Sequence, residues 1–313
     1  MAKKKDEPTY LEEMVWKPGV GPDSSRLREL MVRFGKPRVP LGEAWFMGET
    51  RYLYDELNAG GIDAVSDEYL GAALDELISG MMCFPEMTDW APWYAYLMPR
   101  VLGLERFMKR DMWGVRSVSW YSALCEGFLA LCRSSANEYV ISYKNDFVAV
   151  LSPWVMSGHF WNRGRNIALH ENQEWRTSWG QAGLKPDISL SLLLTWGNVA
   201  PSALRGWLHS VLEIEDVYWR SHFIFWLLKV RPAFEQGDSN SALVNFREIF
   251  GGLGVSGLST ILIPAENVAA LQVAIREEFD EKWYMAMIEQ FSGHPDLWPQ
   301  MESALGTLQE EYL

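Results

Sequence analysis

The stretch "PAENVAALQVAIREEFDEKWYMAMIEQF", residues 264–291, decides the fold class of this chain. Apolar residues recur in it at intervals of three and four, the spacing that places side chains on one face of an α-helix. Glycine and proline follow at positions 293 and 295, as is typical beyond a helix end. The pattern predicts one long helix over 264–291, with this apolar face: Val268, Leu271, Ile275, Phe279 and Trp283.

The same helical spacing dominates the rest of the chain. "SSRLRELMVRFGKP" (residues 24–37) begins with serine caps and ends in a glycine and a proline, and "SDEYLGAALDELISG" (66–80) begins and ends in a similar way. A third helix is expected to start near Thr88, and Pro99 is expected to break or kink it. Further helices are predicted over 116–133, 146–157, 187–197, 202–213, 215–230, 241–250 and 299–312.

Strand signals are few. "NEYVISY" (137–143) and "LSTILIP" (258–264) are short and rich in β-branched residues, which is consistent with one edge pair of strands or with simple connectors. The sequence therefore predicts an all-α protein, either a multi-helix bundle or an irregular α-solenoid of paired antiparallel helices, with at most one or two short strands. Residues 1–20 are expected to be a flexible N-terminal segment. Residues 21–313 are expected to form a single helical domain, with a sub-division near residues 100 and 235 as the alternative.

Composition places the chain among globular proteins. Its 313 residues are 48% hydrophobic and include 16 tryptophans, so a large core can form. The three cysteines form no C-x-x-C pair, which disfavours a disulfide framework or a zinc ribbon and favours a reducing compartment. No apolar run follows the charged N-terminus, and the longest apolar runs fall far short of the roughly 20 residues that cross a bilayer. We expect a cytoplasmic protein with no membrane partner.

Charge is spread unevenly along the chain. The net charge is −13, with −10 over residues 43–99, +4 over 100–231, −10 over 232–313 and +3 before residue 43. Two acidic segments around a mildly basic middle argue against nucleic-acid binding, which needs a basic surface. They favour a partner that is itself a basic protein, because opposite potentials attract and orient the two molecules.

One segment, "WVMSGHFWNRGRNIALHENQEW" (154–175), carries chemically active side chains. A helix here would place His170 and Glu174 on one face, and with His159 these could hold zinc beside Glu171 as a general base. The sequence favours a structural connector instead, in which arginines pair with glutamates and tryptophans pack in the core. In the third interpretation, an interaction surface, the binding residues are Trp161, Arg163, Arg165, His170, Glu171, Glu174 and Trp175.

Two other patterns are less specific. In "HSVLEIEDVYWRSH" (209–222), His209 and Glu213 share a helix face, and His222 would approach them if the next helix returned antiparallel. "GLGVSG" (252–257) matches the dinucleotide-binding glycine pattern. A helix is predicted before it and a strand after it, which is the inverse of the order that such a site requires. We therefore expect no cofactor.

These observations predict a non-enzymatic protein-binding module or inhibitor with acidic surfaces that recognise a basic protein partner. An immunity- or antitoxin-type inhibitor of a basic toxin is one version. The alternative is a helical enzyme, such as a metal-dependent hydrolase. Its site would be built from one of two groups in this chain: His159, His170, Glu171 and Glu174, or His209, Glu213 and His222.

Overall fold

A computed structural model describes residues 10–42, 54–83, 89–104, 120–133, 138–158, 161–162, 165–166, 186–235, 241–245 and 260–312. Helices account for most of these residues, which confirms the predicted all-α fold class. The α-helices are α1 (Ser24–Arg33), α2 (Asp55–Ala59), α3 (Asp67–Cys83), α4 (Trp90–Gly103), α6 (Trp120–Arg133), α7 (Glu138–Ile141), α8 (Lys144–Leu151), α11 (Pro186–Asn198), α12 (Pro201–Leu212), α13 (Val217–Glu235), α15 (Ala265–Glu278), α16 (Glu281–Ser292) and α17 (Trp298–Tyr312). Two 3₁₀ helices, η1 (Ile62–Ala64) and η2 (Ser152–Met156), complete the helical elements of the described ranges.

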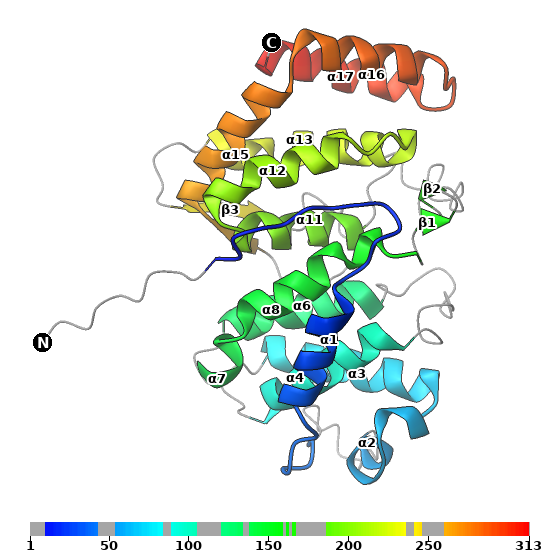
Figure 1. The fold of residues 1–313 in the computed structure, drawn as a ribbon, viewed down its shortest axis with the longest axis vertical. Coiled ribbons are helices and arrows are strands. Elements are labelled where there is room, and N and C mark those ends of the chain that lie inside the picture. The colour runs from blue at the N-terminus through cyan, green and yellow to red at the C-terminus, as the bar shows by residue number, and fades with distance from the viewer. Residues whose placement is uncertain are drawn as a thin grey trace, which may run out of the picture.

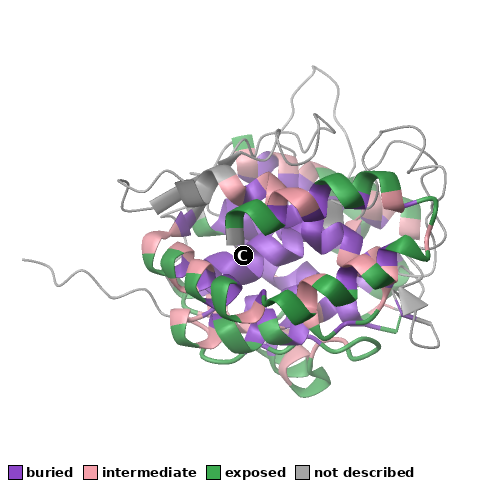
Figure 2. Cartoon of the chain, turned by 90° about the horizontal axis from the view of Figure 1, so that it is seen from above, coloured by how far each residue is buried: buried purple, intermediate pink, exposed green. Residues whose placement is uncertain are grey.

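The helices are stacked in layers along the long axis of the molecule (Figure 1). Helices α16 and α17 form one end, α12, α13 and α15 the next layer, and α1 to α4 the opposite end, with α6, α8 and α11 between. The most extensive helix contacts join α3 to α6 and α12 to α15. Buried residues fill the interior and exposed residues cover the outer helix faces (Figure 2). One hydrophobic cluster runs through the layers, so the stack shares a core.

Strands are confined to two short antiparallel pairs in the described residues. Strand β1 (Trp161–Asn162) pairs with β2 (Arg165–Asn166), and β3 (Ser241–Asn245) pairs with β4 (Thr260–Pro264). The strand predicted over 258–264 is confirmed by β4. The helix predicted over 241–250 is wrong for its first five residues, which form β3, because β4 needs a partner for its backbone groups. Ile263 of β4, which pairs with Ala242 of β3, is fully buried.

For residues 137–143, the strand interpretation is wrong, because this segment contains α7. Tyr139 and Tyr143 are four residues apart, and their rings both pack on Phe34, at 5.9 and 5.3 Å between centroids. Val140 between them is buried. A helical turn brings residues four apart to within about 6 Å of each other, whereas four residues of a strand span about 13 Å, so both rings reach the same phenylalanine only if the segment is helical. Packing against α1 thus overrides the β propensity of the segment.

The long helix predicted over 264–291 is divided into α15 and α16 at Phe279 and Asp280. The Asp280 carboxylate accepts a hydrogen bond of 2.7 Å from the backbone N–H of Trp283 and so caps α16. The rings of Phe279 and Trp283 lie 4.1 Å apart, which keeps the apolar face continuous across the turn. By contrast, Pro99 lies inside α4, which continues to Gly103, so of the expected break or kink the break does not occur.

Residues 10–21 form an extended segment, here named the N-terminal strap, that crosses the middle layers (Figure 1). The N–H of Leu11 donates to the Asn198 carbonyl, and the N–H of Ala200 donates to the Leu11 carbonyl, at 3.1 and 2.7 Å. Further along, Gly19 forms a parallel bridge with Ser157. From residue 10 onward, the segment that was expected to be flexible is therefore packed on the fold. Residues 1–9 lie outside the described ranges.

Trp16 anchors the strap in the core. Its side chain is 1% exposed, and its ring makes edge-on contacts with Trp207 and Trp219 at 5.7 and 5.9 Å between centroids. The backbone N–H of Trp16 donates to Ser210 Oγ at 3.0 Å, and this hydroxyl donates to the Trp207 carbonyl at 2.6 Å. The strap thereby ties the start of the chain to α12 and α13.

Two features show how closely the helices approach. Asn267 on α15 is fully buried, and its Nδ2 donates to the carbonyls of Trp196 and Val199 at the end of α11, at 2.6 and 3.0 Å. Gly80 on α3 lies directly against the ring of Trp90 on α4, so a Cβ at this position would overlap the indole. None of the helices in these ranges combines the length and the apolar character that crossing a membrane requires.

Candidate functional site

The structure places two aromatic residues of the 154–175 segment, Trp154 and Trp161, in the core. Trp161 on β1 is 4% exposed, its Nε1 donates to the Val155 carbonyl at 3.0 Å, and its ring lies 6.1 Å from Trp219. Arg165 lies on β2 in register with Asn162. The other residues predicted for this site lie outside the described ranges: His159, Arg163, His170, Glu171, Glu174 and Trp175.

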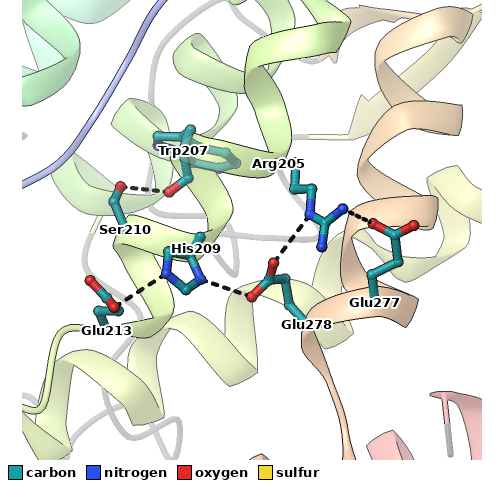
Figure 3. A network of polar contacts seen from close by, with 7 residues as sticks. All are labelled: Arg205, Trp207, His209, Ser210, Glu213, Glu277 and Glu278. Atoms are coloured by element: carbon teal, nitrogen blue, oxygen red, sulfur yellow. Dashed lines mark hydrogen bonds and ion pairs between the residues drawn. The ribbon is translucent and has the colours of Figure 1, made fainter.

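The second predicted cluster forms a polar network on the outer face of α12 (Figure 3). His209 Nε2 lies 3.2 Å from a carboxylate oxygen of Glu213, the i, i+4 partner that the sequence predicts. On its other side, His209 Nδ1 lies 2.9 Å from a carboxylate oxygen of Glu278 at the end of α15. Sequence reasoning missed Glu278 because this contact joins residues 69 positions apart.

Arg205, one turn before His209, extends the network along α15. Its Nη1 lies 2.7 Å from Glu277, and its Nε lies 3.4 Å from Glu278 (Figure 3). Three carboxylates, one guanidinium and one imidazole therefore meet where α12 packs against α15. We name these five residues the α12–α15 network: Arg205, His209, Glu213, Glu277 and Glu278.

His222 does not join this network. It is fully buried on α13, and its Nε2 lies 3.2 Å from Ser189 Oγ on α11, whereas the His209 side chain is 56% exposed. Throughout the described ranges, no group of three or more His, Cys, Asp or Glu side chains is arranged to hold a metal ion. The metal site suggested for His209, Glu213 and His222 is therefore wrong, because two of them lie on the surface and one in the core.

The α12–α15 network favours a positive charge on its imidazole. The hydrogen bond to Glu278 raises the pKa of His209 above its usual value, and the charges of both neighbouring glutamates add to this effect. His209 is thus a cation over a wider pH range than a free imidazole. Its charge and that of Arg205 hold the glutamate side chains in defined positions on a largely exposed surface.

An apolar hollow of about 340 Å³ lies beside the network, between α12 and α15. Small aliphatic side chains form its floor, and the Val273 side chain within it is 52% exposed. Arg205 and Glu277 from the network line its edge, so an ion pair borders an apolar surface. We name this feature the α12–α15 hollow, which is lined by Pro201, Arg205, Ala269, Ala270, Val273, Ala274 and Glu277.

The C-terminal helices α15, α16 and α17 carry a net negative charge. Residues 265–312 contain ten acidic and two basic side chains, a net charge of −8. Most of these acids are exposed. We name the exposed ones the acidic surface: Glu266, Glu277, Asp280, Glu281, Glu289, Asp296, Glu302, Glu310 and Glu311.

Comparisons of this chain with protein-family models, with curated proteins and with solved structures gave no match.

Proposed function

We propose that this protein is a non-enzymatic protein-binding module whose C-terminal helices recognise a basic protein partner. The observation that carries the proposal is the α12–α15 hollow, an exposed apolar depression bordered by the ion pair of Arg205 and Glu277. Protein interfaces commonly combine an apolar centre with a polar, charged rim. This face of α12 and α15 has both parts.

The size and charge of the hollow indicate what the partner presents. A volume of about 340 Å³ accommodates a side chain or two, and is too small for a whole helix. The carboxylate of Glu277 at the rim favours a lysine or arginine next to that side chain. The partner segment is therefore an aliphatic residue next to a basic residue. The net charge of −8 on α15–α17 increases the association rate of such a segment.

A matched pair of substitutions tests this proposal. Val273→Lys puts a positive charge into the hollow, and Val15→Lys makes the same change on the strap, where the valine is 54% exposed. We expect the wild-type chain and Val15→Lys to capture the same basic protein from native cell extract at about 0.05 M salt and to release it at about 0.5 M, where exposed charges are screened. Val273→Lys should capture none of it.

Two outcomes would contradict the proposal. The first is equal retention of the partner by Val273→Lys and Val15→Lys, which would place the interface elsewhere. The second is stoichiometric zinc in the purified protein that disappears in His170→Ala, which would support the metalloenzyme alternative.

A further inference from the structure

A larger hollow, of about 820 Å³, lies at the other end of the molecule between α1 and the α7–α8 segment. Its α1 wall carries three arginines, Arg26, Arg28 and Arg33, and its opposite wall carries Tyr139 and Tyr143. We name it the arginine–tyrosine hollow. Its volume lies within the range of small-molecule sites, roughly 300–1,000 Å³.

The three guanidinium groups have few partners within the described residues. Arg26 Nε lies 3.8 Å from the Asp146 carboxylate, and Arg28 Nε donates to the Ser24 carbonyl at 3.1 Å. The Arg33 guanidinium lies over the Tyr143 ring, 5.4 Å from its centroid. Since each guanidinium has five N–H donors, most of these donors face solvent and are open to a ligand.

The tyrosine wall is held in place from beneath. Phe34, 6% exposed, contacts both tyrosine rings edge-on and stacks on Phe147 with 5.4 Å between centroids. Tyr139 is nevertheless 58% exposed. One ring is thus fixed by buried aromatic contacts while much of its surface is available. A rigid, exposed aromatic ring is a suitable platform for stacking a planar group.

The positive charge of α1 indicates which charged group the ligand carries. The chain as a whole is strongly acidic, at −13, yet α1 has a net charge of +2. Arg26 and Arg33 are two helical turns apart, about 10 Å along the axis, so a chain of phosphates can reach more of the positive groups than a single carboxylate can. Guanidinium groups also match phosphate oxygens in geometry, with two parallel hydrogen bonds.

From the three arginines and the fixed, exposed tyrosine, we propose that the arginine–tyrosine hollow binds a nucleoside polyphosphate. Arg26 and Arg33 bind the phosphates, and the base stacks on Tyr139. Two acids, Glu29 and Asp146, also line the hollow and oppose the phosphates. Asp146 additionally competes for Arg26. Nucleotide binding is independent of the partner surface on α12 and α15, which involves none of these residues.

Isothermal titration calorimetry of the full chain with ATP, in EDTA and about 0.05 M salt, tests the proposal. We expect Arg26→Gln and Arg33→Gln each to weaken binding at least ten-fold. Arg276→Gln, an equal charge change on the exposed face of α15, should leave it unchanged. Tyr139→Ala should weaken binding several-fold, and Tyr139→Phe should not. Asp146→Asn should strengthen it several-fold, because it removes repulsion and frees Arg26.

Three results would overturn the proposal. The first is that the wild-type chain does not bind ATP. The second is that Arg276→Gln loses as much affinity for ATP as Arg33→Gln. In the third, inorganic tripolyphosphate binds as tightly as ATP and Tyr139→Ala changes nothing, which would leave a general anion-binding surface. Saturation-transfer NMR on the wild-type complex with ATP provides a test that does not depend on whether any variant folds. It should show more saturation on the base protons than on the ribose protons, and the reverse order would equally contradict base stacking.

Discussion

Replacing Trp16 by alanine tests whether the N-terminal strap is an integral part of the fold. The indole is 1% exposed and lies between the rings of Trp207 and Trp219. The strap has no helix or long strand of its own to hold it, so this side chain is its main apolar anchor. Truncation to alanine would leave a cavity lined by two tryptophan rings and would remove both edge-on aromatic contacts.

The expected loss follows from the size of this contact. Truncation of a buried Phe or Trp to alanine typically costs about 3–5 kcal/mol of unfolding free energy, and aromatic pairs contribute about 0.5–1.5 kcal/mol each beyond burial. Because a strap on the surface can shift to fill part of the cavity, we expect a loss of about 3 kcal/mol for Trp16→Ala. Trp16→Phe keeps an aromatic ring in the slot and should lose less than half of this amount.

Urea unfolding followed by circular dichroism measures these losses, with Val15→Ala as the matched control. Val15 is the neighbouring residue and is 54% exposed, so its truncation should change the free energy of unfolding by less than about 0.5 kcal/mol. Equal midpoints and slopes for Trp16→Ala and Val15→Ala would refute the reasoning. They would mean that the rest of the chain is equally stable without the Trp16 anchor.

Three further predictions concern helix contacts and the polar network. Gly80→Ala should destabilise the protein by about 1–3 kcal/mol in thermal unfolding, because the new Cβ would overlap the ring of Trp90 on α4. Gly306→Ala on α17, where the glycine has open space around it, should stabilise the protein by about 0.5–1 kcal/mol. Equal effects of the two substitutions would contradict the close approach of α3 and α4 at Gly80. Asn267→Ala should cost about 1–3 kcal/mol for each of the two buried carbonyls it leaves without their donor, measured by urea unfolding, and a loss below about 1 kcal/mol would show that they are solvated instead. The pKa of His209 is raised in the folded state, so its ion pairs stabilise the protein below about pH 6.5 and their contribution is lost as the pH rises through the folded pKa. Wild type should therefore be more stable than His209→Gln by a few tenths of a kcal/mol at pH 5.5 and by less at pH 8.5. A stability difference that grew with pH would contradict the raised pKa of His209.

Local signals predicted much of the fold. The signals around 24–35 locate α1 within a residue or two, although its N-terminal cap is Asp23 and not the predicted serines. The apolar intervals of 264–291 predicted a single helix where the structure has two consecutive ones. The turn at Phe279 and Asp280 was missed because aspartate is also common on exposed helix faces, and its capping role depends on where the chain bends. The strand β3 was missed because its pairing partner, β4, lies about 20 residues later in the sequence.

The candidate sites were harder to predict because they depend on contacts between distant residues. His209 and Glu213 share a helix face, so their contact could be predicted, but Glu278 approaches only when α15 packs against α12. The arginine–tyrosine hollow joins residues more than 100 positions apart, and its tyrosines belong to a segment that was predicted as a strand. The spacing of residues along a single helix or strand cannot show which residues of other elements will lie beside it.

The strap has a consequence for how the chain is made. The hydrogen bond from Trp16 to Ser210 joins residues 194 positions apart, and the two tryptophans that enclose Trp16 are also synthesised long after it. At translation rates of about 5–20 residues per second, the ribosome needs roughly 10–40 s between the first and the last of these residues. During this time the indole of Trp16 has no slot to enter, while α1, α3 and α4 have already emerged. The first described segment to leave the ribosome is therefore among the last to dock.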